Sequence, residues 1–196
     1  MGGSRGRAAP DRFALVPVFP ALETDRLILR ELTQTDAPWY LAHFSRPEIV
    51  AGSGFPAPAD LAAARGELNR YVLDLFARRT GLRWGLVMRG EHELIGSVGL
   101  YAWRDDPEPT AELGYDLAPE FWGRGLMTEA IRAIARYAFD TLGISRLEAT
   151  VIVGNERSCR TLERSGFRHE GVLAAHGEDE HGRLVDEHLY ALRRGG

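Results

Sequence analysis

The segment of residues 112–138 constrains the fold most, because it joins a strand, a glycine-rich loop and a long amphipathic helix. Residues 112–117 predict a strand, and Pro119 ends it since proline has no N–H to give to a sheet. The loop Trp122-Gly123-Arg124-Gly125 then opens the helix. Four apolar residues follow at helical spacing on one face: Ile131, Ile134, Ala135 and Ala138.

The loop between this strand and this helix has the composition of an anion site. The first N–H groups of a helix have no partner within it, and together with the helix dipole they favour phosphate. Gly123 and Gly125 allow close approach of the backbone, and Arg124 adds a positive charge. The same glycines also suit an ordinary turn, in which they only satisfy the backbone dihedrals. The loop alone leaves both interpretations open.

Two familiar phosphate motifs do not fit this loop. A dinucleotide-binding fingerprint would need glycine where the sequence has Thr128. A triphosphate-binding loop would need a lysine, and all 24 basic residues of the chain are arginine. The absence of lysine also excludes Schiff-base mechanisms, including those of pyridoxal-phosphate enzymes.

Length and composition are those of an ordinary globular protein. The 196 residues fit one domain with a substantial core, and 44% of them are hydrophobic. A net charge of −4 without a basic run gives no indication of a nucleic-acid partner. No apolar run reaches the ~18 residues of a membrane span. Cys159 is the single cysteine, so no disulfide can form within the chain, and with no signal peptide this favours a cytoplasmic location.

Five segments in order carry a family resemblance. Besides the central loop, they are LETDRLILREL (residues 22–32), ELIGSVGLY (93–101), NERSCRTLERSGF (155–167) and DEHLYALRR (186–194). Together they cover almost the whole chain and resemble the GNAT superfamily of N-acetyltransferases. Within it, the closest resemblance is to the RimJ/RimL branch, the ribosomal-protein N-terminal acetyltransferases.

The resemblance and the pattern of elements together predict an α/β GNAT fold. We expect a mixed, mostly antiparallel twisted sheet of about six or seven strands with about four helices. Residues 1–12 are expected to be a disordered tail, and residues 13–196 a single acetyltransferase domain. One helix is predicted to start at Thr35–Asp36 and another at Asp60, with residues 51–58 as a loop between them. In the family these helices and this loop wall the acceptor pocket.

For acetyl-CoA, the resemblance implies three groups of binding residues. The pyrophosphate would lie on the backbone of the loop and first helical turn: Trp122, Gly123, Arg124, Gly125, Leu126, Met127 and Thr128. The pantetheine arm would follow the exposed backbone of a splayed strand at Tyr115, Asp116 and Leu117. Asn155 matches an asparagine that hydrogen-bonds pantetheine in the family, although it equally suits the cap of the following helix.

Two residues are candidates for the catalytic groups. Acetyl transfer to an amine needs a base for the amine and a group that stabilises the departing thiolate. Glu112 is the candidate base, acting directly or through one water, and its alternative is a solvated charge at a strand end. Ser158 is the candidate partner of the thiolate, and its alternative is a serine that satisfies the helix backbone. Tyr101 is a weaker candidate for the same pocket.

The resulting prediction is an acetyl-CoA-dependent N-acetyltransferase that works by direct attack in a ternary complex. The acceptor would be a primary amine, either a protein N-terminal α-amine or a small molecule such as an antibiotic or polyamine. A non-catalytic CoA-binding module is the alternative from another class. No metal is expected, since the six histidines show no ligand spacing, and family analogy favours a homodimer.

Overall fold

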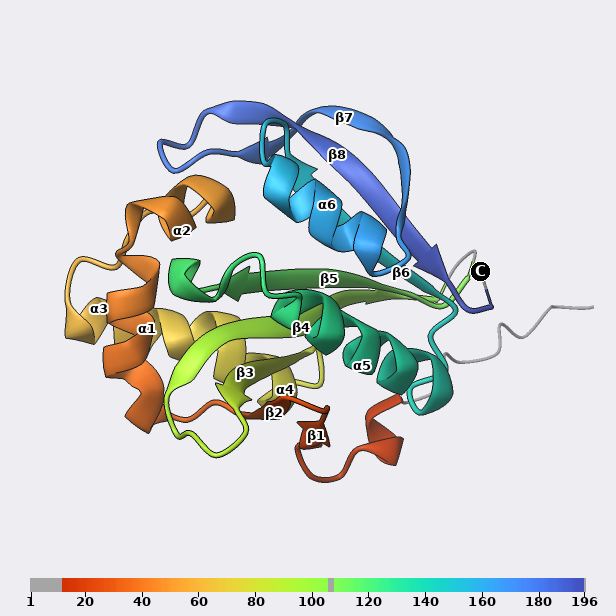
Figure 1. Ribbon diagram of the computed structural model, residues 1–196, viewed down its shortest axis with the longest axis horizontal. Coiled ribbons are helices and arrows are strands. Elements are labelled where there is room, and N and C mark those ends of the chain that lie inside the picture. Colours follow the sequence, from red (N-terminus) through yellow and green to blue (C-terminus); the bar gives the residue numbers. More distant parts are fainter. Residues whose placement is uncertain (1–11, 106–107, 196) are drawn as a thin grey trace, which may run out of the picture.

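Figure 1 shows the computed structural model, which describes residues 12–105 and 108–195. One sheet of eight strands runs through these residues in the order β1-β2-β3-β4-β5-β6-β8-β7. All neighbouring strands are antiparallel except β5 and β6, which are parallel. The strands are β1 (Leu22–Glu23), β2 (Leu27–Glu31), β3 (Leu82–Met88), β4 (Leu94–Arg104), β5 (Thr110–Leu117), β6 (Arg146–Ile152), β7 (Arg168–Glu178) and β8 (Leu184–Arg193). The predicted mixed, mostly antiparallel sheet is confirmed.

The sheet has one strand more than the upper prediction of seven. The additional strand is β1, which pairs Leu22 with Leu29 and Glu23 with Ile28. Two residues are too few to show the alternation by which a strand is recognised in a sequence. The predicted tail, residues 1–12, lies outside the described residues except for Arg12, where a short 3-10 helix (Arg12–Leu15) begins.

Helices cover both faces of the sheet. On one face, α5 (Leu126–Asp140) and α6 (Glu156–Arg164) pack with the larger apolar cluster, which contains Ile134 and Leu86. On the other, α1 (Ala37–Phe44) and α3 (Leu61–Leu68) pack with a second cluster that contains Val87. Leu86 and Val87 belong to different clusters because consecutive strand residues point to opposite faces. Burial of each such side chain contributes roughly 1.5–3 kcal/mol.

The prediction of a loop over residues 51–58 is wrong for its first part. A helix, α2 (Pro47–Ser53), includes Ala51 to Ser53. Pro47 occupies the first turn, where its missing N–H is harmless, and Gly54 ends the helix with a φ of 72°. A Cβ on Gly54 would lie 2.6 Å from the carbonyl oxygen of Glu178 in β7. Glycine is therefore needed where α2 meets the β7–β8 hairpin.

The second predicted helix starts where expected, since the Asp60 side chain accepts a 2.8 Å hydrogen bond from the N–H of Ala63. It is not a single regular helix, because α3 passes through a π-helical turn (Asn69–Leu73) into α4 (Asp74–Ala77). The wider turn is not visible in a 3.6-residue pattern. The prediction of about four helices is too low for this reason and because α2 was read as a loop.

The sheet opens between its two parallel strands. β5 and β6 pair only at Thr110 with Arg146, Ala111 with Leu147, and Glu112 with Glu148. Beyond Glu112, β5 continues to Leu117 along β4, while β6 continues along β8. The last five residues of β5 therefore have no strand partner on the β6 side in the described chain. This is the splayed strand that the family resemblance implies, and Figure 1 shows α6 and α2 above the opening.

Candidate active site

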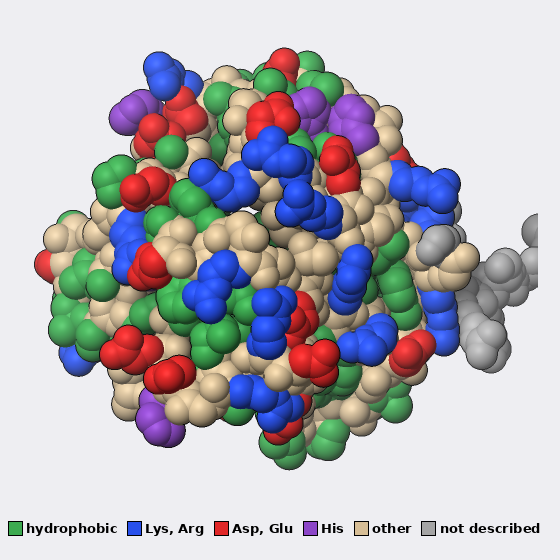
Figure 2. All heavy atoms as spheres, viewed as in Figure 1, with side chains coloured by type: hydrophobic (Ala, Val, Ile, Leu, Met, Phe, Trp, Pro, Cys, Tyr) green, Lys and Arg blue, Asp and Glu red, His purple; other side chains and the backbone are tan. Residues whose placement is uncertain are grey.

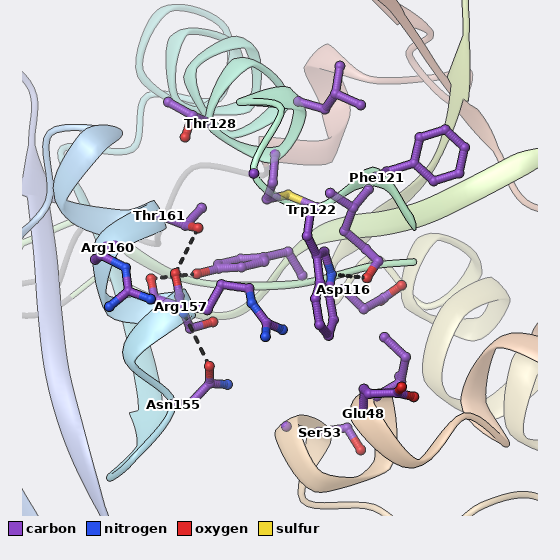
Figure 3. A pocket seen from close by; sticks show the side chains of 18 of the residues that line it. Glu48, Ser53, Asp116, Phe121, Trp122, Thr128, Asn155, Arg157, Arg160 and Thr161 are labelled. Atoms are coloured by element: carbon purple, nitrogen blue, oxygen red, sulfur yellow. Dashed lines mark hydrogen bonds between the residues drawn. The ribbon is translucent and has the colours of Figure 1, made fainter. Parts of the chain in front are cut away.

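A cavity of about 680 Å³ lies at this opening (Figure 3). Four segments line it: α2, the end of β5, the glycine loop with the first turn of α5, and the stretch from Ile152 along α6. A volume of this size is typical of a site for a small molecule or cofactor. Because the sheet opens here, the backbone at the end of β5 is accessible from the cavity.

Most of the predicted cofactor residues meet in this cavity. Those that line it are Tyr115, Asp116, Leu117, Trp122, Gly123, Gly125, Leu126, Met127, Thr128 and Asn155, together with the candidate catalytic residue Ser158. Two predicted site residues do not line it. Arg124 faces a second cavity on the other side of the loop, where its guanidinium carbon lies 5.3 Å from the Phe121 ring centre. Glu112 lies at the point where β5 and β6 separate.

The glycine loop has the backbone form of an anion site. Gly123 and Gly125 have φ values of 72° and 73°, a region that residues with a Cβ rarely adopt. Among the described residues, no side chain caps the start of α5, and its first backbone bond runs from the N–H of Glu129 to the carbonyl of Gly125. The N–H groups of residues 126–128 thus have no helical partner, and they open at the positive end of the helix dipole.

Arg26 holds this loop in place, a role that no local sequence pattern indicates. Its Nη1 donates a 2.9 Å hydrogen bond to the carbonyl of Arg124, and its Nε donates a 2.7 Å bond to the Glu129 carboxylate. Partial burial would raise the pKa of Glu129, but its bonds to Thr24 and Arg26 outweigh burial and lower that pKa. The loop is therefore tied to the start of β2 from the side away from the cavity.

Trp122 forms one wall of the cavity (Figure 3). Its Nε1 donates a 2.6 Å hydrogen bond to the carbonyl of Leu117, which fixes the ring against the end of β5. The guanidinium carbon of Arg157 on α6 lies 3.2 Å from the centre of the Trp122 ring. A cation over an indole face at this range is attractive, so the pair connects α6 to the glycine loop.

Asn155 and Ser158 begin α6. The Asn155 side-chain oxygen accepts a 3.2 Å hydrogen bond from the N–H of Ser158, so Asn155 caps the helix. Tyr115 on β5 donates a 3.1 Å bond to the Ser158 carbonyl, and burial raises the pKa of this tyrosine. The capping role of Asn155 is thus present, while its predicted contact with pantetheine stays a prediction. Both residues line the cavity beside the open edge of β5.

Glu112 belongs to a row of charges at the base of the opening. Its carboxylate lies 3.2 Å from Arg104, which also contacts Glu148 on β6. Tyr101, its neighbour across β4 and β5, lies on the same face of the sheet, and the Tyr101 hydroxyl occupies the space over Gly114. Glu112 therefore faces the side of the sheet opposite Tyr115, since the two are an odd number of strand residues apart.

Asp116 is the most heavily bonded of the predicted cofactor residues. It lies 2.7 Å from Nε2 of His43, and it accepts hydrogen bonds of 2.7 Å from Arg83 and 2.5 Å from the Ser97 hydroxyl. Burial would raise the pKa of Asp116, but these partners outweigh it and lower the pKa to about 2. Its carboxylate is thus engaged within the fold, which leaves its backbone for the predicted pantetheine contact.

We expect Asp116→Asn to lower the free energy of unfolding at about pH 7 by roughly 2–4 kcal/mol, because Arg83 would remain largely buried without a carboxylate. The folded-state pKa lies below the ordinary value of about 3.9, so this contribution is complete above about pH 5 and is lost as the pH falls toward 2. Urea unfolding of both chains at several pH values measures it. If the difference in free energy of unfolding between the unaltered protein and the Asp116→Asn variant stays constant down to about pH 2.5, this role of Asp116 is contradicted.

Three arginines of the cavity were not predicted from the sequence. Arg157, Arg160 and Arg164 line it from one side of α6. Their spacing of three and four residues, directly after the predicted cap Asn155, is the signal that could have revealed a basic helix face.

Comparisons with known proteins agree with this fold and site. Residues 26–168 match the acetyltransferase (GNAT) domain family. The uncharacterized N-acetyltransferase YoaA of Bacillus subtilis (strain 168) is 37% identical over 175 residues, 89% of this chain and 97% of that one. The [ribosomal protein uS5]-alanine N-acetyltransferase of Escherichia coli (strain K12) is 32% identical over 158 residues, 76% of this chain and 79% of that one.

A solved structure gives the same result for the fold. Mycobacterium smegmatis RimJ, in complex with CoA-disulfide, superposes with a TM-score of 0.74 at 22% identity, over 85% of this chain and 81% of that one. The chain therefore belongs to the GNAT family of acetyltransferases and is an N-acetyltransferase, as its resemblance to the RimJ/RimL branch predicted. Within residues 12–105 and 108–195, no helix is long and apolar enough to span a bilayer.

Proposed function

We propose that the protein transfers an acetyl group from acetyl-CoA to a primary amine by direct attack in a ternary complex. The observation that carries this proposal is the cavity in which an unpaired strand edge, residues 113–117, meets the uncapped start of α5. A pantetheine arm offers amide groups that suit a free strand edge, and a diphosphate suits the helix N-terminus. The complex of Mycobacterium smegmatis RimJ with CoA-disulfide supports a CoA ligand here.

The reaction needs little from the protein beyond orientation and two polar groups. The amine nitrogen forms a bond to the thioester carbonyl carbon, the carbon–sulfur bond breaks, and the proton lost by the amine can return to the thiolate. In this proposal Glu112 accepts the amine proton, directly or through one water. Ser158, at the first turn of α6, donates a hydrogen bond to the departing sulfur. The two act from opposite sides of the opened sheet.

We propose a protein N-terminal α-amine as the acceptor. An α-amine has an ordinary pKa near 8 and a lysine amine one near 10.4, so a few-hundred-fold larger fraction of the α-amine is neutral at about pH 7. An α-amine thus needs less help from the base. This suits Glu112, because its carboxylate is already in contact with Arg104. The E. coli relative, an alanine N-acetyltransferase of ribosomal protein uS5, supports the same class.

A thiol-release assay tests the function. The purified protein is incubated with acetyl-CoA and with peptides that begin with Ala, Ser or Met, their N-terminally blocked forms, lysine peptides, polyamines and aminoglycosides. We expect CoA release with free N-terminal peptides and none with blocked ones. Release only with the small amines would instead identify a small-molecule acetyltransferase. Tight acetyl-CoA binding without release by any amine would indicate a non-catalytic binding module.

Binding of acetyl-CoA is expected to stabilise the folded chain. At a ligand concentration 100 times Kd, mass action adds about 2.7 kcal/mol to the free energy of unfolding. A thermal or urea unfolding experiment with and without acetyl-CoA measures this, with adenosine as a control that lacks both the phosphates and the pantetheine. An unfolding midpoint that does not change at millimolar acetyl-CoA would contradict the proposed cofactor.

A further inference from the structure

One side of α6 places three arginines at the cofactor cavity. Arg157, Arg160 and Arg164 all line it, and Thr161 lies among them. Figure 2 shows basic side chains gathered over α6 and the neighbouring start of α5, and all of them are arginines because the chain has no lysine. Such a density of positive charge beside a cavity attracts anions.

These arginines differ from most others in the structure in lacking an acidic partner. Arg26, Arg83 and Arg146, for example, each contact a carboxylate. No carboxylate in the described residues lies within 4.0 Å of Arg160 or Arg164, and neither has another polar side-chain contact there. Two guanidinium groups with free donors therefore face the cavity.

Arg157 already has a role, whereas the other two do not. Its guanidinium stacks on Trp122 at 3.2 Å and so connects α6 to the glycine loop. Arg160 and Arg164 follow one and two turns further along α6, and Figure 3 shows Arg160 at the edge of the cavity beside Thr161. Arg132 of α5 donates a 2.6 Å hydrogen bond to the Arg164 carbonyl, which fixes the distance between the two helices.

The proposed cofactor carries one anionic group that the glycine loop does not serve. Besides its diphosphate, CoA has a phosphate monoester on the 3′ oxygen of its ribose, with a charge near −2 at about pH 7. A guanidinium group binds phosphate oxygens with two parallel hydrogen bonds. Arg160 and Arg164 are four residues apart, about 6 Å along the helix, so both can reach one phosphate.

We propose that Arg160 and Arg164 bind the 3′-phosphate of CoA and thereby make the site selective for CoA over 3′-dephospho-CoA. This inference rests on the proposed acetyl-CoA site, since the diphosphate on α5 must place the ribose near α6. It adds a recognition element outside the glycine loop. Arg160 and Arg164 supply selectivity for the ligand with a 3′-phosphate. The glycine loop binds the diphosphate that CoA and 3′-dephospho-CoA have in common.

Calorimetric titration of CoA and 3′-dephospho-CoA tests this proposal. The protein is compared with the double variant R160Q/R164Q and with the control R136Q, which removes an exposed arginine of α5 that does not line the cavity. We expect the unaltered protein and R136Q to bind CoA about tenfold or more tighter than dephospho-CoA. In R160Q/R164Q this ratio should fall to about one, with dephospho-CoA binding changed less than about threefold.

Three other outcomes would overturn this inference, and they differ in what they imply for the proposed function. Equal affinity of the unaltered protein for both ligands would overturn the inference and leave the proposed cofactor intact. An equal loss of both affinities in R160Q/R164Q would overturn it too, since the arginines would then act on the shared part of the ligands. Binding of neither ligand to the unaltered protein would overturn the proposed function and this inference with it. Unfolding midpoints of the variants confirm that they are folded, as expected for exposed positions.

Discussion

Glu112→Gln is expected to lower kcat for acetyl transfer by about a hundredfold or more, while Kd for acetyl-CoA stays within about twofold. Glutamine keeps the shape of the side chain and its contact with Arg104, but it cannot accept the proton of the attacking amine. Because Glu112 does not line the cofactor cavity, its loss should not affect binding. Steady-state kinetics with a peptide acceptor and a separate titration of acetyl-CoA measure the two effects.

Glu148→Gln is the matched control for this variant. Glu148 stands beside Glu112 across the paired ends of β5 and β6, contacts the same Arg104, and undergoes the same change of charge. We expect it to retain kcat within about threefold, apart from any loss of stability through Arg146. If both variants lose activity equally, the row of charges matters as a whole and Glu112 is not the base.

Gly125→Val should weaken acetyl-CoA binding by about tenfold or more. Gly125 has a φ of 73° and occupies the position just before the first residue of α5, and the nearest atom to an added Cβ is Nη2 of Arg26 at 3.7 Å. The protein itself thus has room for the side chain. The unfavourable φ, roughly 1–2 kcal/mol or more, would shift the loop and misplace the N–H groups that meet the diphosphate.

Gly143→Val separates backbone strain from the effect on the cofactor. Gly143 has a φ of 66° after the other end of α5, an added Cβ would meet no atom of the described part of the chain within 4 Å, and it does not line the cavity. Both variants should lose a similar amount of stability in urea unfolding, but only Gly125→Val should change Kd for acetyl-CoA. An unchanged Kd in Gly125→Val would contradict the proposal that the diphosphate binds at the start of α5.

The parts of the fold that local pattern determines were predictable from the sequence. Ile131, Ile134, Ala135 and Ala138 are all buried on α5. Asp60 caps its helix as expected, because a cap depends only on its own first turn. The loop predicted over residues 51–58 is, in contrast, partly helical, because Pro47 and Gly54 start and end α2, and such residues mark helix ends as readily as loops.

Many of the residues that line the cavity were predictable from the sequence, but the directions in which their side chains point were not. Adjacent residues marked the glycine loop as a candidate anion site, and the family resemblance pointed to Asn155. Arg124 points away from the cavity because it stands between two glycines with left-handed φ, which the sequence cannot specify. The link of Glu112 to Glu148 through Arg104 joins residues far apart in sequence. Such pairings arise from strand order and have no local signature.

A crystal structure of the protein with bound CoA tests the central claim, that the opened sheet and the start of α5 hold this cofactor. We predict diphosphate oxygens within about 3 Å of the N–H groups of Leu126, Met127 or Thr128. The pantetheine arm should run beside the unpaired edge of β5, with its sulfur near Ser158. Well-defined CoA elsewhere on the protein, or a diphosphate that makes no contact with the first turn of α5, would contradict the account.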